Sequence, residues 1–133
     1  LYQGGNAKHN HQLPEGVTEP RHSMLGARIP KGRFAGLQAT ERMVGSLTLR
    51  PLCQRSEFIT LDAHIRGRLQ AELRDTFGRP LQGFELNSCL PVRGDSPHHV
   101  LTWRDAATSA AYRYDTVSLR IEVEDGVLYS VEV

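Results

Sequence analysis

Four acidic residues have the side-chain type that acid–base chemistry on a glycosidic bond requires. Hydrolysis of such a bond uses two carboxyl groups that face one sugar, about 5–10 Å apart. The four candidates are Asp62, Glu72, Asp75 and Asp95. Asp62 and Glu72 fall on the wet faces of expected strands, whereas Asp75 and Asp95 fall at expected turns, where acids cap backbone donors. The sequence therefore predicts no catalytic residue among them.

Five histidines are the candidates for a metal site: His9, His11, His22, His98 and His99. A His-x-His pair on a strand places both rings on one face, which is a workable zinc geometry. No cysteine or acid lies at ligand spacing beside these histidines. Solvated histidines are therefore favoured, and we expect no metal and no other cofactor.

Aromatic side chains are the candidates for stacking on a sugar ring. Trp103 is the only tryptophan, and its neighbour Leu101 places it within an expected strand. A core position is favoured for Trp103, because large aromatic residues dominate small cores. Tyr112 and Tyr114 alternate with Arg113, so both rings could share one exposed face. These three residues are the candidate carbohydrate-binding group.

Two further short features leave alternatives open. Cys53 and Cys89 could form a disulfide in an oxidising compartment, but two small buried apolar residues are favoured. Gly94-Asp95-Ser96 could give one carboxylate to calcium, which takes about six to eight oxygen ligands. Only Asp95 is local, so an ordinary turn is expected.

Length and composition limit the classes of protein to which this chain can belong. A chain of 133 residues suits one domain with a single core. The net charge of +1 argues against a nucleic-acid partner, which would need clustered basic residues. No apolar run approaches the ~20 residues of a membrane span, so no membrane partner is expected. Leu1 indicates a piece of a longer protein, so the localisation cannot be deduced from this sequence.

Short strand signals separated by turn signals begin near Phe34. Alternation is strictest after Gly67, where Leu69, Ala71 and Leu73 point inward and their neighbours outward. Such alternation indicates one buried and one wet face, as in antiparallel sheets. The eight expected strands are Phe34–Ala39, Gly45–Leu52, Phe58–Ile65, Arg68–Asp75, Leu81–Leu86, His99–Arg104, Thr116–Glu124 and Val127–Val133.

Turn signals separate these strands. Thr76–Pro80 is an expected turn, and Pro91–Pro97 is an expected loop. Asp105–Tyr114 is either a helical turn or a long loop. Asp125-Gly126 predicts a tight turn that joins the last two strands in a hairpin. In the last strand Val127, Tyr129, Val131 and Val133 are expected on one face.

These elements predict an all-β fold, an antiparallel two-sheet β-sandwich of jelly-roll type, formed by residues 33–133. Residues 1–32 contain five glycines and three prolines and show almost no periodicity. This part of the chain is expected to be an irregular N-terminal arm.

Several segments resemble one known kind of domain. Gly67 to Phe84 is similar to Gly-x-Leu-x-Val-Glu-Leu-x-Asp-x-x-Gly-x-Pro-Ile-x-Gly-Phe. Cys89 to Ser96 is similar to Cys-x-Pro-Ile-x-Gly-Asp-Ser, and Leu101 to Trp103 to Val-x-Trp. These patterns resemble the C-terminal β-sandwich of bacterial glycosidase-like proteins. Such proteins carry an N-terminal five-bladed β-propeller related to sucrose-, fructan- and arabinan-hydrolysing families.

The resemblance extends over most of the chain, with one departure. Gly32–Leu37, Gly45–Pro51 and Leu128–Val133 also match the sandwich in spacing, and Leu1–Asn6 is similar to a last propeller strand. The family has an acidic Arg-x-Asp-Gly-Phe before the first sandwich strand. Here the segment is Ile29-Pro-Lys-Gly-Arg-Phe34, so that aspartate is absent.

The resemblance implies a supporting role rather than catalysis. The catalytic carboxylates of the family lie on inner propeller strands, which this sequence does not contain. The resemblance implies a non-catalytic accessory domain that packs on the propeller of a larger protein. The apolar arm residues Met24, Leu25 and Ile29 would line that interface.

Two alternatives remain at this point. One is a carbohydrate-binding module that uses the tyrosine pair to hold a polysaccharide. The other is an oligomerisation or interaction domain without sugar binding, since a sandwich is a widely reused scaffold. In that case self-association through uncovered edge strands is expected.

Overall fold

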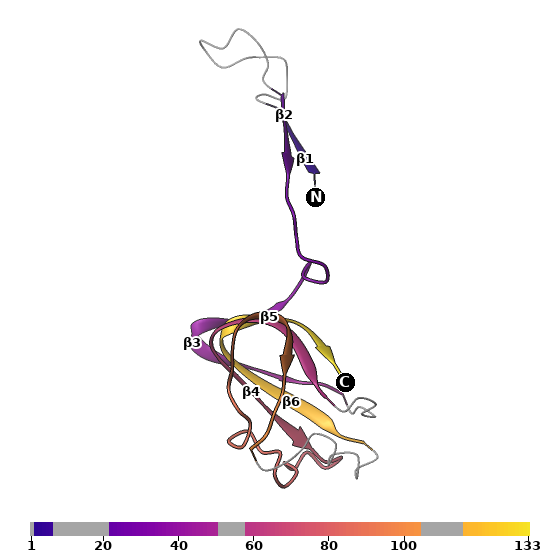
Figure 1. Ribbon diagram of the computed structural model, residues 1–133, viewed down its shortest axis with the longest axis vertical. Coiled ribbons are helices and arrows are strands. Elements are labelled where there is room, and N and C mark those ends of the chain that lie inside the picture. Colours follow the sequence, from indigo (N-terminus) through magenta and orange to yellow (C-terminus); the bar gives the residue numbers. More distant parts are fainter. Residues whose placement is uncertain (1, 7–21, 51–57, 105–115) are drawn as a thin grey trace. The chain divides into compact units, whose positions relative to one another are not determined.

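A computed structural model describes residues 2–6, 22–50, 58–104 and 116–133. Contacts divide the chain into two compact units, Leu1–Phe34 and Ala35–Val133. The described residues form six strands and no helix, and every strand pair is antiparallel (Figure 1). The all-β, antiparallel prediction is therefore confirmed.

The first unit contains a two-stranded ladder. Strand β1, Tyr2–Asn6, pairs with β2, His22–Gly26. The prediction of an irregular arm is wrong for these two segments. A ladder joins backbone N–H and C=O groups, so it can form without the alternation of apolar side chains that the sequence lacks here.

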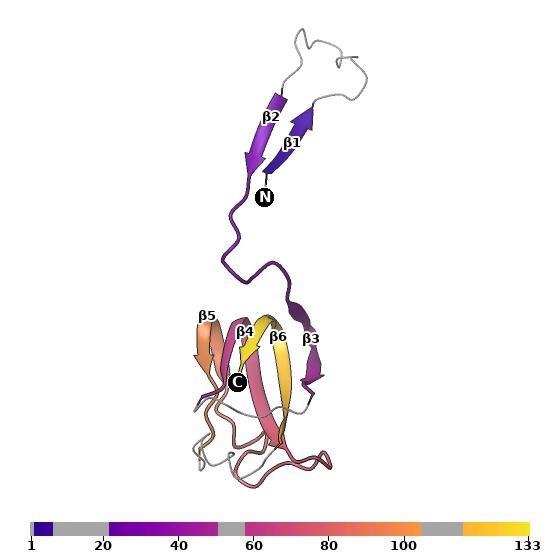
Figure 2. The ribbon, with the colours of Figure 1, turned by 90° about the vertical axis from the view of Figure 1, so that its right-hand side faces the viewer.

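The second unit is built on one four-stranded sheet. Its strands are β3, Leu37–Thr48; β4, Thr60–Arg74; β5, Val92–Val100; and β6, Ser118–Glu132. Their order is β3-β6-β4-β5, so β4 and β6 are central while β3 and β5 form the two edges. Figure 2 shows that the strands curl strongly along their length.

All four strands lose their regular register along one line across the sheet. Between β4 and β6, Ile65 pairs with Gly126 and Arg68 with Glu124, so two residues of β4 face Asp125 alone. The β3–β6 ladder shifts on the same line, between Ala39 and Val44 of β3, and the β4–β5 ladder shifts between Ile65 and Leu69 of β4. An extra residue on one strand bends it and increases its twist. The aligned irregularities therefore fold the sheet over itself.

Two glycines permit the close approach of strands at this bend. A Cβ atom on Gly67 would lie against the backbone carbonyl oxygen of Glu124, closer than real atoms pack. A Cβ on Gly126 would lie 2.7 Å from Cδ1 of Ile65 and 2.9 Å from the carbonyl oxygen of His64. Asp125 adopts a positive φ of 49° at the same place. The bend thus requires residues without a side chain at both positions.

The predicted hairpin at Asp125-Gly126 is wrong. The chain continues through these residues as one bent strand, and both halves of β6 pair with β4. In the same way, Phe58–Ile65 and Arg68–Asp75 merge into β4, and the first two expected strands merge into β3. An Asp-Gly pair supplies the positive φ of a bulge as readily as that of a turn, which explains the misassignment.

The bulges also exchange the faces of the last strand. Leu128 is buried, whereas Val127 and Tyr129 are only half-buried, contrary to the predicted face. The ladder shifts again where Asp62 pairs with Ser130 and Ala63 with Leu128, which leaves Tyr129 as an extra residue. Because side chains alternate with a period of two, each extra residue reverses which side chains point inward.

The core lies on the inner face of the bent sheet, and Trp103 is part of it, as predicted. Trp103 is 4% exposed and donates its Nε1–H to the carbonyl oxygen of Ala71 at 3.1 Å. Its ring meets Phe84 edge-on, with centroids 5.3 Å apart. The fully buried side chains around it include Ile59, Leu61, Leu69, Leu73, Leu101, Leu119 and Ile121.

Three further strand boundaries differ from the predictions. Leu81–Leu86 forms turns instead of a strand, and the expected loop Pro91–Pro97 belongs largely to β5. Strand β5 ends at Val100, so the expected strand His99–Arg104 does not reach Trp103. Trp103 makes only an isolated bridge with Cys89. Proline is tolerated in β5 because an edge strand leaves one row of N–H groups without a ladder partner. Asp105–Tyr114 lies outside the described residues.

The second unit is therefore one curled antiparallel sheet with covering turns. The described strands do not separate into two hydrogen-bonded sheets within this unit. A corner made by a bend within each strand is a known way in which sheet halves come to face each other.

Gly67 and Gly78 give a matched test of the bend. Gly67→Asn should lower the free energy of unfolding by about 2–3 kcal/mol, because its Cβ enters occupied space. Gly78→Asn should lower it by less than about 1 kcal/mol, since Asn tolerates a positive φ and no atom lies within 4 Å of the new Cβ. Urea unfolding monitored by Trp103 fluorescence measures both. Equal destabilisation would contradict the close approach at Gly67.

Candidate functional site

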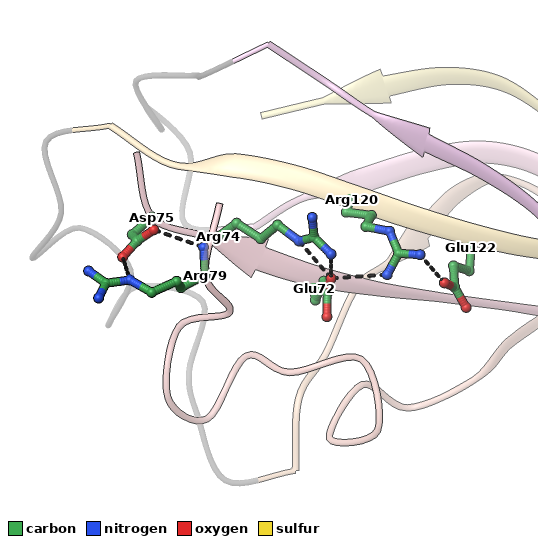
Figure 3. Close-up of polar contacts among 6 residues, drawn as sticks. All are labelled: Glu72, Arg74, Asp75, Arg79, Arg120 and Glu122. Carbon is green, nitrogen blue, oxygen red and sulfur yellow. Dashed lines mark hydrogen bonds and ion pairs between the residues drawn. The ribbon is translucent and has the colours of Figure 1, made fainter. Parts of the chain in front are cut away.

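The outer face of β4 and β6 carries a connected row of charged side chains (Figure 3). Glu72 and Arg120 are direct cross-strand neighbours, and Arg120 Nη1 lies 3.1 Å from Glu72 Oε1. Arg74 Nε donates to the same oxygen at 2.7 Å. Arg120 also pairs with Glu122 through its second nitrogen. One carboxylate is thus held between two guanidinium groups, and one of these guanidinium groups holds a second carboxylate.

Glu72 lies in an unusual environment for a charged side chain. It is only 5% exposed. Burial by itself would raise the pKa of Glu72, but the hydrogen bonds and charges of Arg74 and Arg120 outweigh it and lower the pKa below 4.5. Glu72 is therefore ionised near neutral pH. A buried carboxylate is stable in that form only because its partners satisfy it.

A cleft of about 490 Å³ opens beside this row. Gln70 fixes its rim, because its side-chain amide donates to the carbonyl oxygens of Leu86 at 3.2 Å and Cys89 at 2.9 Å. Glu85 on that rim accepts the N–H of Gly83 at 3.0 Å. The cleft is lined by Val44, Arg68, Gln70, Glu72, Glu85, Leu86, Asn87, Glu122 and Glu124.

Each carboxylate in the cleft already has a cation or a hydrogen-bond donor. Glu72 and Glu122 share Arg120. Glu124 pairs with Arg68, its cross-strand neighbour, at 2.8 Å. These three carboxylates, like Glu85 on the rim, bind groups of the protein itself. A general acid would need a raised pKa, and the pKa of Glu72 moves the other way. The geometry of these ion pairs suits a role in holding β4 and β6 in register better than a role in proton transfer.

A tight turn after β4 presents an aromatic ring to solvent. Asp75 Oδ1 accepts the N–H groups of Phe77 and Arg79, each at 2.9 Å, and Asp75 Oδ2 accepts Arg79 Nε at 3.0 Å. These bonds lower the pKa of Asp75, the bond from the Arg79 N–H most of all. Phe77 at the tip is 81% exposed, and the Arg79 guanidinium lies over its ring at 5.2 Å. The turn therefore holds an exposed Phe–Arg pair in place.

The four acids proposed from sequence do not come together as one pair. The prediction that Asp75 caps backbone donors at a turn is confirmed. Asp62 and Glu72 are buried rather than on wet faces, which corrects the expected exposure. Asp95 lies within β5 rather than in a turn, and its Oδ2 lies 3.4 Å from His64 Nδ1.

The described histidine candidates lie on two strands that do not pair with each other. Within the described ranges, no three His, Cys, Asp or Glu side chains lie close enough to hold a metal ion. His22 begins β2, while His98 and His99 lie near the end of β5. The ring of His99 contacts the carbonyl oxygen of Ala63 at 3.2 Å. His9 and His11 lie outside the described residues.

The remaining sequence candidates stay predictions. Tyr112, Arg113 and Tyr114 lie outside the described residues, and so does Cys53. Met24 and Leu25 lie on β2, and Ile29, three residues beyond that strand, is 37% exposed. Cys89 carries a buried free thiol, and burial raises its pKa. A buried thiol in its neutral form is a poor nucleophile.

Two features were missed by sequence reasoning. Phe77 was read only as part of a turn, although Asp75 followed by Gly78-Arg79 is a signal for a capped turn with an exposed tip. The second is a largely apolar groove of about 430 Å³ between the two halves of β3 and the end of β6. We call it the apolar groove; its apolar lining includes Leu37, Leu47, Leu49, Leu128 and Val131. The sequence gives no signal for it, since it depends on the bend.

In the part of the chain that the structure describes, no helix is long and apolar enough to cross a membrane.

Removing the charge of Glu72 tests its role in stability. Glu72→Gln should lower the free energy of unfolding by about 1–3 kcal/mol at pH 7, because two arginines lose the negative charge that they share. The pKa of Glu72 is lower in the folded state than its ordinary value of 4.5. Its stabilisation is therefore complete well above pH 4.5 and declines as the pH falls through the folded pKa. The gap between the wild type and the variant should narrow at pH 3.

Glu132→Gln is the control for this measurement. Glu132 is an exposed carboxylate at the end of the neighbouring strand β6, and its only described side-chain bond is a 3.4 Å contact from the Thr60 hydroxyl. Its removal should change stability by no more than about 0.5 kcal/mol. Urea titrations at both pH values measure all three proteins. An equal effect of the two substitutions would show that Glu72 has no special role.

Comparison with known proteins gave no match: no protein-family model, no curated protein and no solved structure aligned with this chain. The resemblance to the C-terminal sandwich of propeller glycosidase-like proteins stays a prediction from the residues quoted above.

Proposed function

We propose that the chain is a non-catalytic accessory β-domain of a glycoside-hydrolase-like protein and packs on the catalytic propeller of that protein. The two halves of the bent sheet would act as the two layers of a jelly-roll-type sandwich. The proposal rests on the matching segments from Gly67 to Trp103. The observation that carries the non-catalytic part is the Glu72–Arg74–Arg120–Glu122 network.

The network matters because catalysis and stability make opposite demands on a carboxylate. A glycosidase needs one acid with a raised pKa and a second carboxylate facing the same sugar. Here Arg120 lies between Glu72 and Glu122 and holds both. Removing Arg120 from that position to admit a substrate would leave Glu72 buried next to fewer cations, which is unfavourable.

The proposed contact with the propeller uses the first unit. Met24, Leu25 and Ile29 are apolar residues in and just after β2. Ile29 is exposed in the described chain. Burial of such an apolar side chain against a neighbouring domain would stabilise the contact, because apolar surface is removed from water.

The intact mass of the protein in its source, together with an activity assay, tests the proposal. We expect a native species several times larger than 14.9 kDa that contains this chain. We expect the isolated chain to release no product from aryl fructosides, aryl arabinosides or sucrose, since no described acid meets the requirement above. A stable native species near 14.9 kDa would contradict the accessory role, and hydrolysis by the chain that is lost in Glu72→Gln would contradict the non-catalytic role.

A carbohydrate-binding module is the second candidate, because the turn at Asp75 fixes Phe77 in an exposed position. An exposed aromatic ring can stack on the C–H face of a sugar. A glycan array compares the wild type with Phe77→Ala and with the double variant Tyr112→Ala/Tyr114→Ala. Binding that disappears in either variant would favour this candidate, and the absence of any bound glycan would sink it.

A further inference from the structure

The two edges of the sheet in the second unit differ in how they meet solvent. Strand β5 forms one edge, and β3 forms the other (Figure 2). The β5 edge contains Arg93, Asp95 and Pro97, and Gly94 bends it with a φ of 93°. Charges, proline and bends are the features that keep an edge strand from pairing with another chain. The β5 edge is therefore protected.

The second half of the β3 edge, after the bend, lacks this protection. From Met43 to Leu49 the strand has no charged residue and no proline. Met43 is 69% exposed and Val44 is 54% exposed. Among the described strands only β6 pairs with β3, and it does so on one side. On the other side of β3, the backbone N–H and C=O groups have no ladder partner among the described strands.

The hydrogen-bond pattern identifies which residues present those groups. The N–H of Leu49 donates to the carbonyl oxygen of Leu119 on β6 at 2.9 Å. In an antiparallel ladder, alternate residues point their backbone groups to opposite sides. Val44, Ser46 and Thr48 therefore direct their N–H and C=O groups away from β6, along the open edge.

The apolar groove lies next to this edge. Because β3 bends between Ala39 and Val44, its two halves face each other, and Leu37 comes to line the same groove as Leu47 and Leu49. Leu37 is 60% exposed there. A strand added to the open edge would extend the inner layer and cover this apolar surface.

We propose that the open edge of β3 pairs antiparallel with β3 of a second copy of this chain, forming a two-fold dimer. A strand centred on Ser46 is complementary to itself. Ser46 would pair with Ser46 of the other copy, and Val44 with Thr48. All three are residues whose backbone groups point outward, so both strands offer donors and acceptors in register. A two-fold contact of this kind uses the same patch on both copies.

Charge and side-chain direction also suit a second copy. No charged residue lies between Met43 and Leu49, so this central part of the pairing places no like charges opposite each other, and Arg42 and Arg50 face each other only at its two ends. In this register, odd-numbered residues face odd-numbered residues of the other copy. Leu47 of each copy therefore stays on the inner layer beside the other copy's Gly45. The inner apolar layer would thus continue across the two-fold axis, next to the apolar groove of each copy.

The expected affinity is modest. A pair of seven-residue strands and the side chains beside them form an interface at the small end of the range for specific complexes. A dissociation constant of about 1–100 µM follows from such an area with few anchoring side chains. The proposal is independent of any link to sugars.

Sedimentation equilibrium of the full chain, from about 1 µM to about 500 µM, tests the proposal. The wild type should shift with concentration from 14.9 kDa toward twice that mass. Ser46→Lys places two charges at the two-fold axis and should weaken the dimer at least about tenfold. His98→Lys adds the same charge to an exposed position of the β5 edge and should leave the dimer unchanged.

Cross-linking decides which edge is used. In a Cys53→Ala background, Ser46→Cys should give a covalent dimer with a short bismaleimide reagent, whereas His98→Cys should not. Cys89 is buried and should not react. A protein that stays at 14.9 kDa over the whole range would overturn the proposal and leave the edge to a different partner. A dimer that is insensitive to Ser46→Lys and cross-links through His98→Cys would also overturn it.

Discussion

The bend that β3, β4, β5 and β6 make along one line is the constraint on which the rest of this structure depends. At this line Gly67 and Gly126 let the backbones approach, Asp125 adopts a positive φ, and Arg66 Nη2 lies 2.6 Å from Asp125 Oδ1 across the bulge. The bend makes the inner apolar residues of each strand face one another. Without it, a single sheet of four strands would leave one apolar face in water, which is unfavourable because a sheet must bury its apolar face against another layer.

On the outer face of β4 and β6, charged side chains stabilise the pairing of the two strands. Glu72 is covered and ionised because Arg74 and Arg120 surround it. Cross-strand charge pairs disfavour a slip of one residue between β4 and β6, since a slip would bring Arg120 away from Glu72. The carboxylates of the cleft beside this row thus have their partners within the fold.

Sequence reasoning identified the buried face within each half of β4, but it failed where the halves of a strand join and also for Leu81–Leu86 and Pro91–Pro97. The alternation of Leu69, Ala71 and Leu73 correctly gave the buried face of β4, and the core position of Trp103 followed from its size and place. Bulges were not visible, because Asp125-Gly126 carries the same signal for a turn and for a bent strand. That single ambiguity produced the wrong hairpin and the wrong face for Val127 and Tyr129.

The candidate site was less accessible to sequence reasoning. An acid on the outward face of a strand was expected to be wet, and Glu72 was assigned that way. Its burial depends on long-range neighbours, Arg120 above all, which lies 48 residues away in the sequence. The apolar groove likewise arises only when the two halves of β3 fold toward each other. Such features depend on tertiary contacts that one sequence does not reveal.

The most direct test of this account is a set of cross-strand NMR contacts along β6. If β6 is one bent strand, backbone protons of Ile121 should contact those of Ala71, and backbone protons of Leu128 should contact those of Ala63, so that both halves of β6 lie against β4. Contacts between Val123 and Leu128 would instead indicate a hairpin at Asp125-Gly126. That result would contradict the bend and every feature that depends on it.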